Sequence, residues 1–157
     1  LIYTKRKMKV LKLISITFLL FLICIIEIYL NTFISLNFGV YIYFLTLLLI
    51  SVDFYDQNLV LPIFLSGVLY DSFFSTYYMG LYSSIFILIV IIGNFLVSKY
   101  SKSNIIYFAI LSICFLIYIS PFIFVFDINY WLSRYLLSVI INFIAFMILK
   151  RIFSLNV

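Results

Sequence analysis

The feature that most constrains this chain is the absence of Lys and Arg between Lys12 and Lys99. The charged residues within that stretch are all acidic: Glu27, Asp53, Asp56 and Asp71. Over the whole chain 68% of the residues are hydrophobic and 10% are charged, whereas soluble domains have about 45–50% apolar and about 25% charged residues. We therefore expect an all-α protein, folded as a single integral membrane domain over residues 1–157.

Six apolar segments come close to the length of about 20 residues that a helix needs to cross a bilayer. We expect these spans at residues 11–30, 33–52, 58–76, 79–98, 104–126 and 130–149, separated by short polar breaks such as Asn31-Thr32. The second span contains Gly39 and the third contains Pro62 and Gly67. Tilted, kinked or partly re-entrant forms of both stay open, because such residues need neighbouring helices to satisfy the backbone.

The distribution of basic residues predicts the topology of these six spans. Five basic residues lie between Lys5 and Lys12, two lie in the break at residues 99–102, and Lys150 and Arg151 follow the last span. Because basic residues flanking membrane spans favour the cytoplasmic side, we expect a polytopic bundle with both termini in the cytoplasm. The net charge of +5 is therefore an orientation signal, and no nucleic acid is expected as a partner.

The basic start followed by an apolar run is similar to a signal peptide. However, Leu13–Leu30 is longer than the usual apolar core, and no Ala-x-Ala-like site follows it. We expect it to stay in the protein as the first transmembrane helix, with Met8 as an alternative start. Cys24 and Cys114 lie within apolar runs and are expected to be buried thiols. The chain has no His, which excludes imidazole catalysis and His-based metal sites.

Asp71 is an acid in an apolar segment, where a charged side chain costs at least about 2.5 kcal/mol and is usually paired, inward-facing or functional. The topology places it in the outer half of the third span. Gly67 precedes it by four residues and shares its helix face, with Ser66 and Tyr70 close to that side. A small residue one turn from a polar one allows close helix contact and an interhelical hydrogen bond. Asp71 is expected either to join two helices or to bind a partner or ligand.

Arg134, near the outer start of the sixth span, is the candidate counter-charge for these acids. We expect Asp71 or Glu27 to pair with Arg134, close to Asp127 in the preceding loop. In the alternative, Glu27 and Arg134 extend towards the lipid headgroups. For Glu27 that alternative is the favoured interpretation.

The spacing Pro62-x4-Gly67-x3-Asp71-x8-Gly80 resembles the signature of the rod shape-determining protein MreD family, which consists of small bacterial inner-membrane proteins. The family has a Gly-Leu-Leu-x-Asp element followed by Leu-Gly. Gly67-Val-Leu-Tyr-Asp71 matches the first element, and Met79-Gly80 matches the second with Met in place of Leu. The basic start, the six spans and the short loops extend the resemblance over the chain, although only these positions are specific.

The resemblance implies a non-enzymatic inner-membrane component of the complex that elongates the lateral cell wall and organises peptidoglycan synthesis. The implied partners are an MreC-like periplasmic protein, indirectly a cell-wall glycosyltransferase and transpeptidase, and membrane lipids. It implies no catalytic residue, cofactor or metal. The residues expected to serve partner binding or helix packing are Pro62, Gly67, Tyr70, Asp71 and Gly80. The family also looks related in fold to the substrate-binding subunits of energy-coupling-factor vitamin transporters.

Two other functions stay open. A transporter substrate-binding subunit would need an outward-facing polar cavity, to which Asp71, Glu27, Arg134 and Asn142 could contribute. An intramembrane peptidase would need two embedded aspartates, one acting as an acid and the other as a base. Only Asp71 is clearly embedded and no Gly-x-Gly-Asp element occurs, so the peptidase is the weakest of the three functions.

Overall fold

The computed structural model describes residues 2–33, 39–74, 78–100, 103–121 and 127–154, with the side chains of residues 2–10, 33 and 154 left out. Regular structure in these ranges is entirely helical, which confirms the expected all-α class. Six α-helices occur: α1 (Ile2–Phe33), α2 (Ile42–Asp53), α3 (Val60–Phe74), α4 (Leu81–Lys99), α5 (Asn104–Ile119) and α6 (Ile128–Ser154). A 3-10 turn, η1 (Gln57–Leu59), leads directly into α3.

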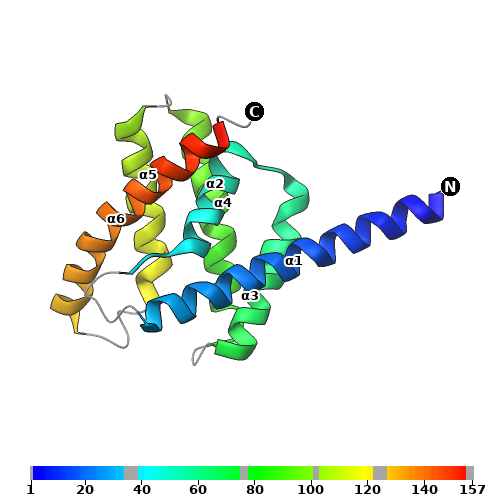
Figure 1. The fold of residues 1–157 in the computed structure, drawn as a ribbon, viewed down its shortest axis with the longest axis horizontal. Coiled ribbons are helices and arrows are strands. Elements are labelled where there is room, and N and C mark those ends of the chain that lie inside the picture. The colour runs from blue at the N-terminus through cyan, green and yellow to red at the C-terminus, as the bar shows by residue number, and fades with distance from the viewer. Residues whose placement is uncertain (1, 34–38, 75–77, 101–102, 122–126, 155–157) are drawn as a thin grey trace.

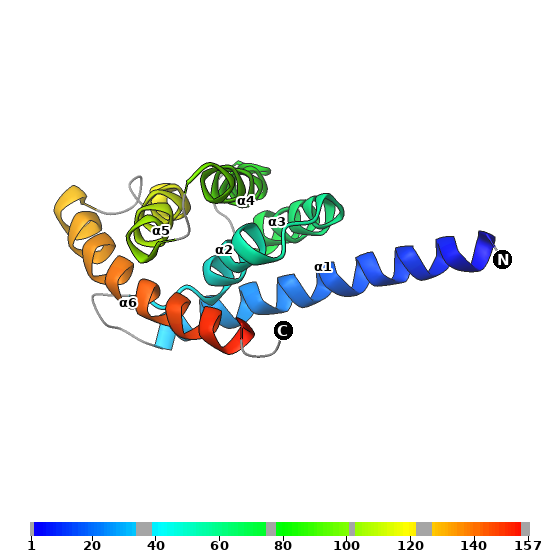
Figure 2. The same cartoon turned by 90° about the horizontal axis from the view of Figure 1, so that it is seen from above.

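Helix α2 lies at the centre of the bundle, with α1 and α6 on one side and α3, α4 and α5 on the other (Figures 1 and 2). It packs against α1, α4, α5 and α6. Its buried side chains come from all sides of the helix: Tyr43, Phe44, Leu45, Leu47, Leu48, Leu49, Ser51 and Val52. A helix that is apolar all round is expected in such an enclosed position.

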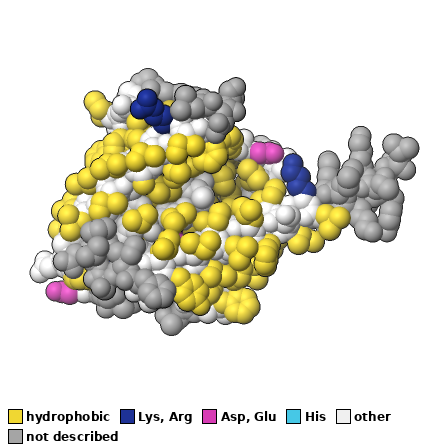
Figure 3. Space-filling model, viewed as in Figure 1, with side chains coloured by type: hydrophobic (Ala, Val, Ile, Leu, Met, Phe, Trp, Pro, Cys, Tyr) yellow, Lys and Arg dark blue, Asp and Glu magenta, His cyan; other side chains and the backbone are white. Residues whose placement is uncertain are grey.

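The length and composition of three helical segments are sufficient to cross a membrane. They are Leu11–Thr32 of α1, Leu81–Lys99 in α4 and Ile128–Phe153 of α6. Hydrophobic side chains cover much of the described surface in the view of Figure 3, and charged side chains lie near its edges. The chain is therefore a multi-pass membrane protein, because an apolar surface of this extent suits lipid and not water.

The structure corrects several span boundaries. The expected break at Asn31-Thr32 is wrong, since α1 continues to Phe33. The second span was expected at residues 33–52, but α2 begins only at Ile42, and residues 39–41 are not helical. Helix α5 ends at Ile119, and a 3-10 turn follows at residues 120–121. Residues 34–38, 75–77 and 122–126 of the expected spans lie outside the described residues.

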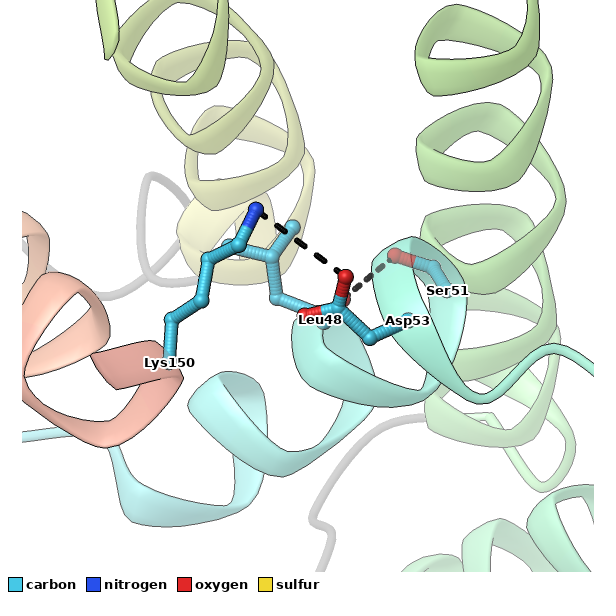
Figure 4. A network of polar contacts seen from close by, with 4 residues as sticks. All are labelled: Leu48, Ser51, Asp53 and Lys150. Carbon is cyan, nitrogen blue, oxygen red and sulfur yellow. Dashed lines mark hydrogen bonds and ion pairs between the residues drawn. The ribbon is translucent and has the colours of Figure 1, made fainter. Parts of the chain in front are cut away.

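Successive helices from α2 to α6 run in alternating directions, so α2, α4 and α6 end on the same side of the bundle (Figure 1). A contact at that side joins two of these ends. Lys150 Nζ lies 3.9 Å from Asp53 Oδ1 (Figure 4). The same nitrogen lies 3.4 Å from the centre of the Tyr107 ring. One ammonium group thus links α6 to α2 and α5 through an ion pair and a cation–π contact.

An aromatic core fills the space between α2, α4 and α5. The Tyr43 ring lies 4.7 Å from that of Phe86, and the Phe44 ring lies 5.2 Å from that of Phe115. The rings of Phe86 and Tyr118 are stacked at 6.0 Å. Cys24 and Cys114 are free and buried, which confirms the expectation from their apolar surroundings.

Candidate functional site

Asp71 joins the end of α3 to the start of α4. Its side chain is 5% exposed. Oδ2 accepts the backbone N–H of Gly80 at 2.9 Å and that of Ser83 at 3.2 Å, and Oδ1 accepts that of Tyr82 at 3.1 Å. The Ser83 hydroxyl adds a longer bond of 3.4 Å. The carboxylate therefore takes the place of an N-cap side chain for α4, where backbone N–H groups lack helical partners and negative charge is stabilised.

Two glycines of the motif make this arrangement possible. Gly80, the residue before α4, has φ of +99°, a left-handed conformation that glycine adopts without a steric penalty. Gly67 lies where α3 crosses α4: a Cβ placed on it would lie 2.4 Å from Ser83 Cα and 2.9 Å from Ser83 N. The two helices approach so closely because no side chain separates their backbones.

The other motif residues lie along the same helix. Pro62 is buried in the first turn of α3, where a missing N–H removes no helical hydrogen bond. The Tyr70 ring packs 4.6 Å from that of Tyr82 on α4. Ser66, the residue before Gly67, forms a hydrogen bond of 2.7 Å with the Tyr43 hydroxyl through its own hydroxyl. This bond links α3 to α2. The structure thus brings the motif residues together in α3 and the start of α4.

Glu27 plays the same part for α2. Its Oε2 accepts the backbone N–H of Tyr43 at 2.7 Å and that of Phe44 at 3.4 Å. Its Oε1 accepts the Tyr118 hydroxyl at 2.5 Å. The side chain is 6% exposed, so the expectation that Glu27 reaches the lipid headgroups is wrong. The N-terminus of α2 lies inside the bundle, and its orphan N–H groups hold the carboxylate there.

Residues 39–41, directly before α2, are not helical, and side chains of α1 and α6 form hydrogen bonds with their backbone groups. Asn31 of α1 accepts the N–H of Val40 at 3.1 Å and donates to the Val40 carbonyl at 3.1 Å. Ser138 of α6 accepts the N–H of Gly39 at 3.0 Å. Asn142 accepts the N–H of Tyr41 at 2.9 Å and donates to the Gly39 carbonyl at 2.9 Å. Irregular backbone is tolerated at membrane depth only with such partners.

The expected pairing of Arg134 with Asp71 or Glu27 is also wrong. Neither acid forms an ion pair with Arg134 in the part of the chain that the structure describes, where Lys150 and Asp53 make the one ion pair. Arg134 Nη1 lies 3.4 Å from the Tyr130 hydroxyl and beside that of Tyr41. Both acids instead bond backbone N–H groups, whose dipoles balance a carboxylate without a cation.

Sequence reasoning missed several residues that hold this site. Tyr118, Ser83 and Ser138 carried no prediction, and Asn142 was considered only for a transporter cavity. One signal was available on α6, where Arg134, Ser138 and Asn142 recur every four residues and so share one face of a largely apolar helix. That pattern predicts a polar contact, although it does not identify residues 39–41 as the partner.

The chemistry available at these two caps is limited by the bonds already made. Every buried side-chain nitrogen and oxygen atom of the described residues has a hydrogen-bond partner. No group of three or more His, Cys, Asp or Glu side chains comes together among them to hold a metal ion.

Comparison with protein-family models, with curated proteins and with solved structures finds no match.

Proposed function

We propose that the chain is a non-enzymatic component of the bacterial inner membrane that belongs to the complex for cell shape and lateral wall elongation. The resemblance of Pro62, Gly67, Asp71 and Gly80 to the MreD signature supports this assignment. The observation that carries the proposal is the bonding of Asp71. Its carboxylate accepts three backbone N–H groups of the next helix turn, so the motif specifies the shape of a helix hairpin, as a scaffold requires.

The proposal includes six membrane spans with both ends in the cytoplasm. Helix α2 has 12 residues and is therefore about 18 Å long, well short of the hydrocarbon thickness of about 30 Å. The non-helical residues 39–41 lengthen this span, and η1 lengthens the span of α3. Alternation of direction from α2 to α6 supports the same topology, since it brings Lys99, Lys150 and Arg151 to one side (Figure 1).

If the organism that encodes the protein is a rod-shaped bacterium, as the proposal requires, depletion of the protein in that organism tests this function. We expect cells to widen and become round under the microscope as the protein is lost. Affinity isolation of a tagged, functional copy should recover an MreC-like periplasmic protein together with a cell-wall transpeptidase. Normal cell shape after depletion, with no cell-wall proteins recovered, would contradict the proposal.

One observation favours the substrate-binding subunit of a vitamin transporter as a second candidate. The N-terminus of α2 lies inside the bundle behind an irregular segment, an arrangement that transporters use to bind anionic substrates. Here Glu27 occupies the position that a substrate anion would take, which is the reason for ranking this function second. A panel of water-soluble vitamins should leave the melting temperature of the purified protein unchanged; a reproducible increase with one vitamin would reverse the ranking.

A further inference from the structure

A groove of about 730 Å³ opens between α1 and the chain that leads into α3. Its volume falls within the range of about 300–1,000 Å³ that is usual for small-molecule sites. Most of its wall is apolar, with Ile16 from α1 and Leu61 and Pro62 from α3, and its charged side chains are Lys12 and Asp56. Acidic and basic side chains lie in this region at the edge of the apolar surface in Figure 3. The groove thus has an apolar wall and a polar mouth.

The mouth carries one charge of each sign, and both have bonding capacity left. Both bonds from Asn58 to Asp56 go to Oδ1, which leaves Oδ2 able to accept a further donor. Lys12 has three donors. Among the described residues neither side chain takes part in an ion pair. A ligand with a negative and a positive group would therefore complement this mouth.

The position of the groove indicates that the ligand comes from the bilayer. Asp56 follows α2 at the side of the bundle where Lys150 meets Asp53, which the topology assigns to the cytoplasmic surface. Lys12 of α1 lines the groove on this side. A basic side chain near the membrane surface attracts lipid phosphates.

We propose that the groove binds a phospholipid whose headgroup carries a primary amine, such as phosphatidylethanolamine. Lys12 contacts the phosphate, Asp56 Oδ2 accepts the ammonium group, and an acyl chain lies along Ile16, Leu61 and Pro62. A choline headgroup has no N–H to donate to Asp56, and a glycerol headgroup has no positive charge to pair with it. The preference for the amine is thus the specific consequence of Asp56.

Native mass spectrometry of the purified protein tests this site with dioleoyl lipids that differ only in their headgroup: ethanolamine, choline and glycerol. Binding of the ethanolamine lipid should be about two- to five-fold tighter than that of the choline lipid, the range for an exposed ion pair. Asp56→Asn should abolish this preference, and Lys12→Gln should weaken the binding of all three lipids. The matched control is Asp53→Asn, an acid three residues away that pairs with Lys150 and should leave the preference intact.

The design separates charge from folding. Asn is a favoured N-cap residue, so Asp56→Asn keeps an acceptor for the backbone N–H of Asn58. The comparison of ethanolamine with choline on the unmodified protein needs no variant. Equal binding of these two lipids, tighter binding of the glycerol lipid, or a preference that survives Asp56→Asn would each overturn the proposal. None of these outcomes bears on the cell-shape function, because the lipid site and that function are independent proposals.

Discussion

Asp71 accepts the backbone N–H of Gly80 at 2.9 Å, which ties the C-terminal end of α3 to the turn that begins α4. Glu27 forms an equivalent bond of 2.7 Å to the N–H of Tyr43 at the start of α2. Each acid lies on one helix and caps the next helix of the chain. The first four helices are therefore joined in pairs by buried carboxyl groups that bond the N–H groups of a helix N-terminus and not a cation.

The close contacts of two glycines predict different responses to added volume. Gly67→Ala should lower the unfolding free energy by about 1–3 kcal/mol, because its Cβ would meet the Ser83 backbone. The Cβ that Gly93→Ala adds would instead meet the side chain of Ser51, at 2.5 Å from Oγ and 2.9 Å from Cβ. Adding Ser51→Gly should therefore restore much of the stability of Gly93→Ala, whereas Ser83→Gly should not restore that of Gly67→Ala. Thermal unfolding in detergent measures both pairs, and equal recovery in the two pairs would contradict the backbone contact.

Substitutions at Glu27 separate its hydrogen bonds from its charge. Glu27→Leu leaves the N–H of Tyr43 and the hydroxyl of Tyr118 without this acceptor, and each unsatisfied buried group costs about 1–3 kcal/mol. Glu27→Gln keeps one carbonyl oxygen for the α2 N-terminus and should be clearly milder. Denaturant unfolding followed by tryptophan fluorescence at Trp131 compares the two variants. A Gln variant as unstable as the Leu variant would show that the charge itself is required.

Loss of Asn142 should loosen the segment before α2 without unfolding the bundle. Asn142→Ala removes the acceptor of the Tyr41 N–H and a donor to the Gly39 carbonyl. Hydrogen exchange should therefore speed up in peptides that cover residues 39–43 and stay slow in α5, since local opening follows the lost local bonds. Ser133→Ala, whose hydroxyl bonds within its own helix turn, is the control. Unchanged exchange at residues 39–43 would mean that Asn142 does not hold this segment.

The topology predicts which introduced thiols react from outside the cell. The proposed topology places Tyr78 and Asp127 in outer loops, so Tyr78→Cys and Asp127→Cys should react with a membrane-impermeant maleimide in intact cells. Gln57→Cys should react only after permeabilisation, and all three parent residues are exposed. The native cysteines give little background, because Cys24 is 1% and Cys114 0% exposed. Reaction of Gln57→Cys in intact cells would contradict the cytoplasmic assignment.

The sequence was sufficient to predict the helical class, because long apolar runs in a chain of this composition have no other stable form in lipid. It could also predict that Gly67 and Asp71 share one face of a helix, since this depends only on spacing. The start of α2 at Ile42 was not predictable from hydropathy. Residues 39–41 are apolar and carry no signal that would end a helix. Their conformation depends on Asn31, nine residues away, and on Ser138 and Asn142, about a hundred residues away in the chain.

The partners of the acids were not predictable for a related reason. Arg134 was the only basic residue near the outer ends of the expected spans, so it was the predicted ion-pair partner of Asp71 or Glu27. The structure satisfies Asp71 with N–H groups that lie nine to twelve residues along the chain. Backbone donors occur at every non-proline residue, so composition cannot reveal which of them become free at a helix start.

The melting temperature of Asp71→Ala in detergent tests most directly that Asp71 acts by capping α4. The matched control is Ser72→Ala, the exposed neighbour whose hydroxyl bonds only within α3. Loss of the cap should cost about 1–3 kcal/mol and lower the melting temperature by about 2–4 °C for each kcal/mol in a chain of this size, while Ser72→Ala stays at the wild-type value. An Asp71→Ala protein that melts at the wild-type temperature would contradict the capping role. It would favour the other expected role of Asp71, which is to bind a partner or ligand.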